Sequence, residues 1–299
     1  NWGLVYDELK KVKEDIILVR VKGLGSTGPH ATDVTWGPNV GNIMGSTYLW
    51  NYPESAFSTG EARSQHPDFM GGVTAAYAVV LALIHRKRTG QGQWIDSAQL
   101  EVGASLLGPK YLEYHVNGEE PRPMGNYSMT AAPYGAFRCA GEDRWCVIGV
   151  YTQEEWVAFC TATGRPALAS DARFATHLQR TRNPVALRQA VEEWTANRDP
   201  YEVMESLQAA GVMAAVVQDV EDQFKRDKQY EARGFLVSGD EPELGPLVTE
   251  GVPVKLSLTP GGVQGYSPLV GEHTEEVART VLGLSPSEIE TLEQEQVLF

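Results

Sequence analysis

Residues 68–96 read DFMGGVTAAYAVVLALIHRKRTGQGQWID, and the pattern of this stretch decides the fold class. The strongly apolar run 73–86 predicts a helix, and Gly90 follows it as a typical helix end. Residues 94–96 then predict a short strand, and 100–115 predict a long helix. A helix, a glycine turn, a strand and a second helix in this order are typical of α/β proteins with parallel strands.

The sequence on either side extends this pattern. A buried strand is expected at 16–21, ahead of a glycine-rich loop at 22–37. The character of the chain changes near Pro121, and we expect a separate α+β domain over 122–230. In this domain strands are expected at 134–138, 145–150 and 213–217, and helices at 152–162, 184–196 and 200–209. Two further helices, at 272–282 and 287–296, are expected to close the chain.

The composition limits the class of protein and its partners. The chain has 299 residues, 42% of them hydrophobic, which is enough for one large domain or two smaller ones. Its formal net charge of −14 would repel nucleic acid and anionic membranes, so neither is an expected partner. Three cysteines are too few for a disulfide framework, which predicts a reducing, cytoplasmic setting. No apolar run is expected to span a bilayer, and segment 73–84 is interpreted as a buried core helix.

Asp68 is the strongest candidate for chemistry. Pro67 restricts the backbone before it, and Gly71 and Gly72 let a ligand approach the main chain closely. A carboxylate just ahead of the expected helix faces the positive end of the helix dipole and amides without an intrahelical partner. Such a carboxylate could attack a carbonyl group while those amides hold the oxyanion that forms. The alternative is that Asp68 is only the N-cap of the helix, a position that aspartate favours.

Other kinds of site find less support in the sequence. Residues 23–28 match the pattern G-x-G-x-x-G after a strand, but a polar, aperiodic stretch follows where a dinucleotide site needs a helix. The glycines still provide main-chain amides, with Lys22 alongside, that a phosphate or a thioester could use. The six histidines show no metal-binding spacing, and the G-x-S-x-G motif of serine hydrolases is absent. We therefore expect no metal site, and a carboxylate nucleophile remains.

Several motifs together resemble the family III CoA-transferases, which include formyl-CoA transferase and carnitine CoA-transferase. The most specific is the run R-T-G-x-G-Q at 88–93, which follows the segment Asp68–Gly72 and its Ala-rich helix. The resemblance extends through essentially the whole chain, with further matches at Val21–Gly25, Gly28–Pro29, Met124–Asn126, Ala132–Gly135, Leu207–Val212, Gly271–His273 and Leu282–Ser285.

The resemblance implies a particular architecture. Residues 1–121 would form the middle part of a Rossmann-like α/β large domain that carries the aspartate and is incomplete in this chain. Residues 122–230 would form the smaller α+β domain, and 231–299 would return to the large domain. The family also implies about 100 further residues at the front of the chain. Two subunits would interlock, either as a homodimer or as a heteromer with a related subunit.

The resemblance also implies an activity. The family's catalytic aspartate falls on Asp68, which would attack an acyl-CoA thioester to give a mixed anhydride and CoA thiolate. Return of the thiolate would give an aspartyl-CoA thioester, from which a small carboxylic acid takes over the CoA. The members that it resembles most act on dicarboxylic or aromatic acids. Coenzyme A and acyl-CoA would be substrates, and no tightly bound cofactor is expected.

The remaining site residues are also implied by the resemblance. Gly71 and Gly72 would donate amides to the oxyanion, and Lys22, with Gly23 and Gly25 beside it, would contact CoA. The loop made by Gly125, Asn126, Tyr127 and Ser128 would lie over the active site and protect the anhydride from water. The alternatives are a solvated strand end for Lys22 and an ordinary interdomain turn for this loop.

Two rival functions remain open at this stage. The α-methylacyl-CoA racemases carry an aspartate in a similar setting but need an upstream histidine, which the corresponding residues 35–42 lack. His66 could be argued as a substitute base, although a loop residue is the more typical interpretation. The chain could also be a catalytically silent subunit of a heteromeric CoA-transferase. An acyl pocket could be lined by aromatic side chains that more typically lie in a core, namely Trp36, Tyr48, Trp50 and Tyr52.

Overall fold

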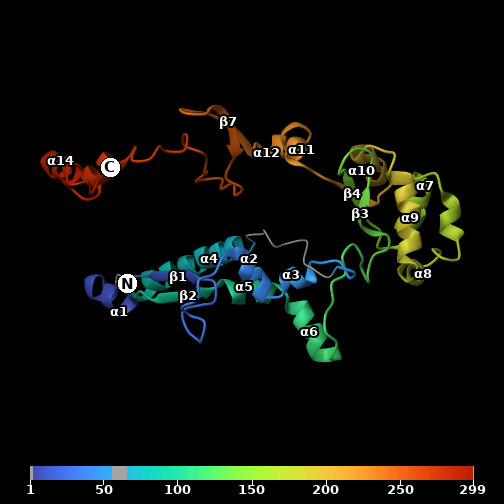
Figure 1. Ribbon diagram of the computed structural model, residues 1–299, viewed down its shortest axis with the longest axis horizontal. Coiled ribbons are helices and arrows are strands. Elements are labelled where there is room, and N and C mark those ends of the chain that lie inside the picture. Colours follow the sequence, from blue (N-terminus) through green and yellow to red (C-terminus); the bar gives the residue numbers. More distant parts are fainter. Residues whose placement is uncertain (1–2, 56–65, 299) are drawn as a thin grey trace. The chain divides into compact units, whose positions relative to one another are not determined.

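The computed structural model describes residues 3–55 and 66–298 of the chain. The chain divides into two compact units, Asn1–Val217 and Gln218–Phe299. The first unit contains the α/β elements and the three-stranded sheet described below, and the second contains a hairpin and four helices (Figure 1). The mixed α/β fold expected from the sequence is confirmed.

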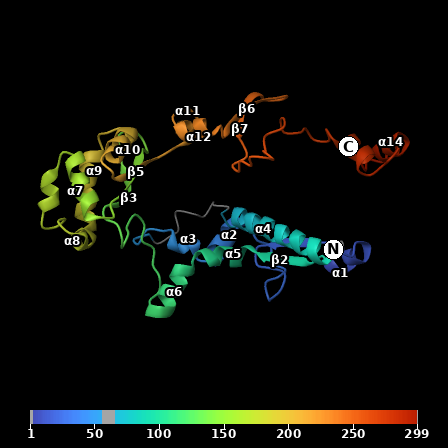
Figure 2. The same ribbon diagram turned by 180° about the vertical axis from the view of Figure 1, so that it is seen from behind.

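The first half of unit 1 is built on one parallel pair of strands. Strand β1 (Leu18–Lys22) pairs with β2 (Trp94–Ala98), with Leu18 opposite Trp94 and Lys22 opposite Ala98. Helix α4 (His66–Thr89) runs along this pair and contacts both strands (Figures 1 and 2). The other helices of this half are α1 (Tyr6–Val12), α2 (Gly37–Ile43), α3 (Ser46–Leu49), α5 (Gln99–Leu106) and α6 (Gly108–Asn117).

Two helix predictions need correction. Helix α4 begins at His66 rather than at Val73, so Asp68 lies inside its first turn instead of ahead of it. A proline is tolerated there because the first-turn amides have no intrahelical partner. The single long helix expected at 100–115 is two helices, which break at Leu107 ahead of Gly108 and Pro109. Proline at the start of α6 removes an amide that a continuous helix would need.

The expected burial of α4 is also wrong. The buried residues of this helix are Pro67, Gly71, Ala75 and Ala82, and they lie on the side that contacts the strands, α2 and α5. On the remaining surface Phe69 is 70% exposed, Val73 67% and Tyr77 66%. Among the helices that the structure describes, α4 is long and apolar enough to cross a membrane by length and composition, with 22% of that window buried. A core helix of a soluble protein meets the same criterion.

The turn between α4 and β2 depends on glycine. Gly90 has φ +75° and its amide donates to the carbonyl of Arg86 at 2.8 Å, which closes the helix. A Cβ on Gly92 would lie 2.0 Å from the carbonyl oxygen of Ile16, because the chain ahead of β1 passes directly against this turn. The two glycines of the run R-T-G-x-G-Q are therefore required by the turn that brings the start of β2 beside β1.

We expect Gly92→Ala to destabilise the protein by about 3 kcal/mol, since the new methyl group meets backbone rather than a movable side chain. Urea unfolding monitored by circular dichroism measures the change. The matched control is Gly72→Ala, where nothing lies within 4 Å of the added Cβ and the change should stay within about 1 kcal/mol. Equal midpoints for the two variants would contradict the close approach.

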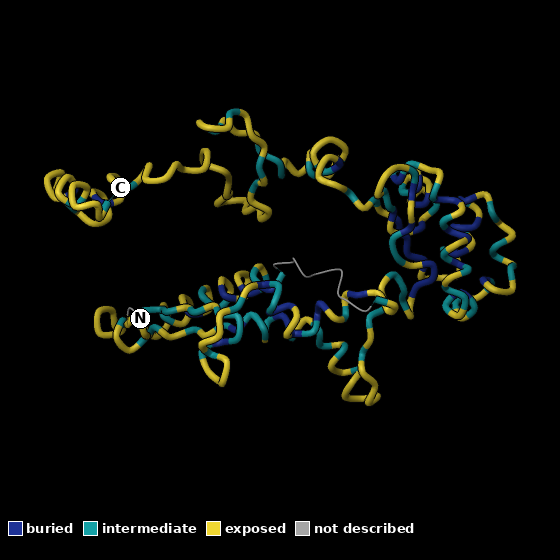
Figure 3. The backbone as a smooth tube through the Cα atoms, in the orientation of Figure 1, coloured by how far each residue is buried: buried dark blue, intermediate teal, exposed yellow. Residues whose placement is uncertain are grey.

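The second half of unit 1 is an antiparallel sheet covered by helices. Its strand order is β3 (Tyr134–Arg138), β4 (Trp145–Gly149) and β5 (Met213–Val217), which confirms the paired strands expected from the sequence. The covering helices are α7 (Gln153–Ala162), the 3-10 helix η2 (Pro166–Ser170), α8 (His177–Arg182), α9 (Pro184–Thr195) and α10 (Pro200–Ala209). Buried residues gather here, around the stacked rings of Trp156 and Phe159 (Figure 3).

Unit 2 is described separately. It begins with α11 (Val220–Lys225) and α12 (Lys228–Arg233), followed by the antiparallel hairpin of β6 (Leu236–Glu241) and β7 (Gly245–Glu250). The closing helices are α13 (Thr274–Thr280) and α14 (Pro286–Gln294), which contact each other. Ser285 and Glu288 form a reciprocal capping box at the start of α14, which fixes the beginning of that helix.

Candidate active site

The candidate site lies at the carboxyl ends of the parallel strands. Because β1 and β2 are parallel, Lys22 and Ala98 end at the same edge of the pair, and the chain leaves this edge through Gly23 and Gln99. The amide of Leu100 donates to the carbonyl of Gly23 at 2.9 Å, so the two exits are joined. Ligands of open α/β sheets bind outside the carboxyl ends of the strands.

Asp68 reaches this edge from the first turn of α4. The side-chain amide of Gln99 donates from Nε2 to Asp68 Oδ1 at 2.8 Å. The carboxylate is half-buried, and no described residue donates to its second oxygen, Oδ2. Because Asp68 is the third residue of α4, it is not the N-cap. One oxygen is therefore held by Gln99, and the carboxylate lies at the positive end of the helix dipole.

Gly71 allows this approach. A Cβ at Gly71 would lie 2.9 Å from Cγ of Gln99 and 3.6 Å from Cγ1 of Val21, so the second turn of α4 packs directly on β1 and on the start of α5. Gly72 is exposed, with nothing within 4 Å of an added Cβ. Gly71 is thus required by packing, while Gly72 has free space beside its Cα. Both residues lie beyond the first four of α4, where main-chain amides donate to carbonyls within the helix. Their role as oxyanion donors stays a prediction.

The loop after β1 folds back on itself. The ammonium group of Lys22 donates to the carbonyl of Ala31, so this side chain is tied to the loop instead of standing free at the strand end. A Cβ on Gly23 would overlap Oγ1 of Thr35, and Gly25 has φ +85°. Lys22, Gly23 and Gly25 therefore shape the edge beside Gln99. Their contact with CoA stays a prediction.

The loop at 125–127 is held between two parts of unit 1. The amide of Gly125 donates to the carbonyl of Asn51 at 3.0 Å, and Asn126 donates from Nδ2 to the hydroxyl of Tyr52 at 3.3 Å. Asn126 also accepts from the amide of Ala136 at 3.3 Å, which ties the loop to β3. Glycine is required at 125, where φ is +53° and a Cβ would lie 2.7 Å from the ring of Tyr52.

One segment, 50–52, contacts both candidate parts of the site. The ring of Trp50 lies 6.0 Å from the ring of His66, two residues before Asp68, while Asn51 and Tyr52 hold the loop. His66 lies in helix α4, so its interpretation as a loop residue is wrong. No contact among the described residues joins Asp68 directly to the loop at 125–127, and residues 56–65, which precede α4, lie outside the described part.

Two cavities flank Tyr52. One of about 720 Å³ is lined by Tyr48, Tyr52 and neighbours that include Asn51 and Arg122. The other, of about 380 Å³, is lined by Tyr52 together with Asn126, Tyr127 and Arg188. Trp36, Tyr48, Trp50 and Tyr52 are all exposed, so the interpretation of these rings as core residues is wrong. Asp68 lines neither of these two cavities.

The cysteines are unsuited to nucleophilic chemistry. Burial raises the pKa of the Cys139 and Cys160 thiols to about 11 and that of Cys146 to about 12. All three therefore remain protonated near neutral pH, and the thiolate is the reactive form. Within residues 3–55 and 66–298, no group of three His, Cys, Asp or Glu side chains is arranged to hold a metal ion.

Sequence reasoning missed Gln99 and the anchoring role of segment 50–52. Gln99 is the first residue after β2 and the first residue of α5. This position could have marked it, because ligand-binding side chains lie where parallel strands end. No comparable local signal marks Asn51 or Tyr52.

Comparison with known proteins defines the class. The model of CoA-transferase family III matches residues 1–274. The chain is 33% identical to the beta subunit of a succinyl-CoA–L-malate CoA-transferase of Chloroflexus aurantiacus, over all of this chain and 73% of that protein. It is 27% identical to a succinate–glutarate CoA-transferase of Agrobacterium fabrum, over 98% of this chain and 70% of that one. A CAIB/BAIF family crystal structure from Brucella suis superposes with a TM-score of 0.81 at 28% identity, covering 92% of this chain and 70% of that one.

The chain therefore belongs to CoA-transferase family III. It is a CoA-transferase, an enzyme whose substrates are CoA thioesters and carboxylic acids. The fold expected from the resemblance is confirmed by the structural neighbour.

Proposed function

We propose that this chain transfers CoA from an acyl-CoA donor to a small carboxylic acid through a covalent intermediate on Asp68. The observation that carries the proposal is the Asp68–Gln99 contact of 2.8 Å at the carboxyl edge of the parallel strands. It supports a carboxylate that is oriented through one oxygen and able to react through the other. Within this proposal, residues 1–121 and 231–299 form the large domain, and 122–230 form the smaller one.

The proposed reaction proceeds by exchange at two carbonyl groups. Oδ2 of Asp68 attacks the thioester carbonyl, the C–S bond breaks, and CoA leaves as thiolate, which gives a mixed anhydride. The thiolate then attacks the carbonyl carbon of Asp68, and the donor acid leaves as carboxylate. The acceptor carboxylate attacks the resulting aspartyl thioester and expels the thiolate. A final attack of the thiolate on the acceptor acyl carbon restores the carboxylate of Asp68.

Gln99 has a defined role in the proposed reaction steps. Whenever the carbonyl carbon of Asp68 is attacked, negative charge develops on the oxygen that does not carry the acyl group. That oxygen is Oδ1, to which Gln99 donates. The contact therefore supports two functions, because it orients Oδ2 before the first attack and stabilises the oxyanion in the later ones.

The relatives favour dicarboxylic acids as the acids of this chain. Malate, succinate and glutarate occur in the names of the two relatives described above. We accordingly propose a dicarboxylic donor and acceptor, and a partner that is a second copy or a related subunit, since one relative is the beta subunit of such an enzyme. An interlocked dimer and a cytoplasmic location belong to the same proposal.

An activity screen tests the function. The purified protein is incubated with succinyl-CoA and with malate, glutarate or an aromatic acid, and new CoA thioesters are separated by liquid chromatography. New thioesters that form only when an acid is added support transfer. Exchange of an α-proton with deuterated water in the absence of any acid would support the racemase instead. Activity that appears only after a related chain is added would indicate the silent subunit.

Tyr52→Phe is expected to increase the share of acyl-CoA that is hydrolysed rather than transferred, by about fivefold. The variant removes the hydroxyl that Asn126 contacts, and a looser loop would admit water to the anhydride. The ratio of free acid to new thioester measures the effect. Tyr48→Phe is the matched control, because Tyr48 lines the same large cavity and is not the hydroxyl that Asn126 contacts. Equal ratios in the two variants would contradict a protective loop.

A further inference from the structure

Residues 124–133, here called the strap, connect the loop at 125–127 to β3. The loop end of the strap is held by the contacts described above. At the other end, the amide of Ala132 donates to the carbonyl of Val150 at 2.9 Å, and the side chain of Ala131 is 1% exposed. Both ends of the strap are therefore fixed to unit 1.

The middle of the strap, 127–130, has one hydrogen bond to another part of the chain. The hydrogen bonds of Tyr127 and Thr130 end on other residues of the strap. The imidazole of His177 contacts the carbonyl oxygen of Met129 through Nε2 at 3.2 Å. Among the residues that the structure describes, this contact alone joins the middle of the strap by a hydrogen bond to the rest of the protein.

His177 must donate in this contact, because a carbonyl oxygen can only accept. Nε2 therefore carries the proton, and Nδ1 is the acceptor of the ring. Nδ1 is buried and has no hydrogen-bond partner among the described residues. The half-buried ring thus has a single polar contact in the described part of the chain, and that contact is with the strap.

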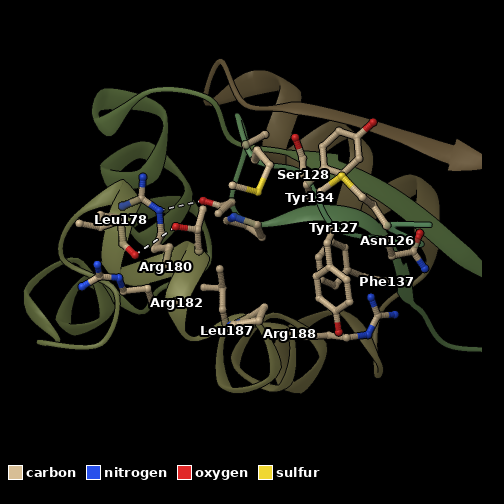
Figure 4. Close-up of a pocket in the computed structure, with 17 residues that line it drawn as sticks. Asn126, Tyr127, Ser128, Tyr134, Phe137, Leu178, Arg180, Arg182, Leu187 and Arg188 are labelled. Carbon is tan, nitrogen blue, oxygen red and sulfur yellow. Dashed lines mark hydrogen bonds between the residues drawn. The ribbon is translucent and has the colours of Figure 1, made fainter. Parts of the chain in front are cut away.

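Packing does not fix the middle of the strap. A cavity of about 340 Å³ lies between the strap and helices α8 and α9. Figure 4 shows Tyr127 and Ser128 on one side of this cavity and Leu178 and Arg180 of α8 on the other. On the strap itself, Met129 is 76% exposed. A segment with free space on one side and solvent on the other depends on its hydrogen bonds for a defined position.

Helix α8 holds His177 at a fixed place. Arg180, three residues later, is 0% exposed and donates from Nε to Ala132 O at 2.8 Å and from Nη1 to Phe174 O at 3.1 Å (Figure 4). Its guanidinium also lies 5.0 Å from the ring centroid of Trp156 in the core. The helix that carries His177 is therefore anchored both to the core and to the fixed end of the strap.

We propose that His177 is a positioning residue for CoA transfer, because its hydrogen bond to Met129 keeps the strap where it excludes water from the acyl group on Asp68. This inference rests on the proposed function, in which the loop at 125–128 lies over that group. It adds helix α8, which has no described contact with Asp68, to the elements that decide between transfer and hydrolysis.

The step that His177 suppresses is hydrolysis of the anhydride. Water attacks the acyl carbon, the bond from that carbon to the oxygen of Asp68 breaks, and the electron pair stays on the aspartate carboxylate. The thiolate takes up a proton and leaves as free CoA. The net result is the conversion of acyl-CoA and water into free acid and CoA, with Asp68 unchanged.

Two substitutions of His177 separate its hydrogen bond from its bulk. His177→Phe keeps a ring of similar size and removes the donor. His177→Gln can place its side-chain amide nitrogen where Nε2 lies, so it should restore the contact. The matched control is His115→Phe, since His115 is an exposed histidine in the last turn of α6.

Hydrogen exchange followed by mass spectrometry measures how firmly the strap is held, and it uses the full chain without CoA or acid. In His177→Phe, the amides of 127–130 should exchange about tenfold faster than in the unaltered protein, which corresponds to the loss of one hydrogen bond. In His177→Gln and in the control, exchange should match the unaltered protein. Circular dichroism confirms that each variant is folded.

The partition between hydrolysis and transfer measures the consequence for the reaction. With succinyl-CoA and malate, the ratio of free succinate to new thioester should rise about threefold in His177→Phe. It should stay unchanged in His177→Gln and in the control. A merely structural role would lower the amount of active enzyme and so reduce both products together, without a change in their ratio.

Unchanged exchange at 127–130 in His177→Phe would overturn the proposal. Faster exchange with an unchanged product ratio, in a protein that transfers CoA, would overturn it as well. An unaltered protein that forms no new thioester would instead refute the proposed function on which this inference rests. The two failures are distinguishable because the exchange measurement needs no substrate.

Discussion

Asp68→Asn should lower the rate of CoA transfer by about a thousandfold or more, because the amide cannot act as the nucleophile. The variant keeps the shape of the side chain and an oxygen that can accept from Gln99 Nε2, so the packing of α4 should persist. Steady-state formation of the new thioester measures the loss. In the unaltered protein, acyl-CoA donor followed by hydroxylamine should leave a hydroxamate at Asp68, which peptide mass spectrometry locates.

The matched control is Glu101→Gln. Glu101 is an exposed acidic residue in the first turn of α5, so its replacement removes a similar charge at a similar place in a neighbouring helix. Its transfer rate should stay within about twofold of the unaltered protein. Full activity of Asp68→Asn, or a hydroxamate on another carboxylate, would exclude the covalent role of Asp68.

The second large effect is expected at Gln99. Gln99→Leu should reduce transfer about a hundredfold, because the developing oxyanion at Oδ1 of Asp68 loses its donor. Leucine keeps the contact with Gly71 that positions the first turn of α4. Gln91→Leu is the matched control, since Gln91 is an exposed glutamine in the turn after α4. A rate for Gln99→Leu equal to that of the control would show that the contact is only structural.

Gln99→Glu separates orientation from charge. The variant keeps a side chain of the same shape and replaces the amide donor by a carboxylate. When ionised, this carboxylate cannot donate to Oδ1 and places a negative charge beside the developing oxyanion, so transfer near neutral pH should fall at least as far as in Gln99→Leu. Steady-state formation of the new thioester measures the loss. A rate for Gln99→Glu well above that of Gln99→Leu would contradict the donor role of Gln99.

The α/β class could be predicted from the sequence because its signals are local. Glycines mark the end of α4 and the turn that follows, and the alternating residues of 134–138 and 145–150 form paired strands as expected. The start of α4 could not be predicted in the same way. Pro67, Gly71 and Gly72 resemble loop residues, yet a proline is tolerated in the first turn of a helix, and Gly71 allows the next turn to pack closely on β1.

The site itself was only partly predictable. Asp68 was found from its neighbours in sequence, whereas its partner Gln99 lies 31 residues away and is brought close by the pairing of β1 with β2. The burial of α4 was misjudged because composition reports how apolar a helix is and not how many elements cover it.

The buried thiols have a practical consequence. Cys139, Cys146 and Cys160 are buried and stay protonated near neutral pH, so alkylating reagents should not modify them. A cysteine introduced at Ser128 could then be labelled selectively with a fluorophore. The emission of that dye would report, in a single cuvette, whether an added acid or thioester changes the surroundings of residue 128.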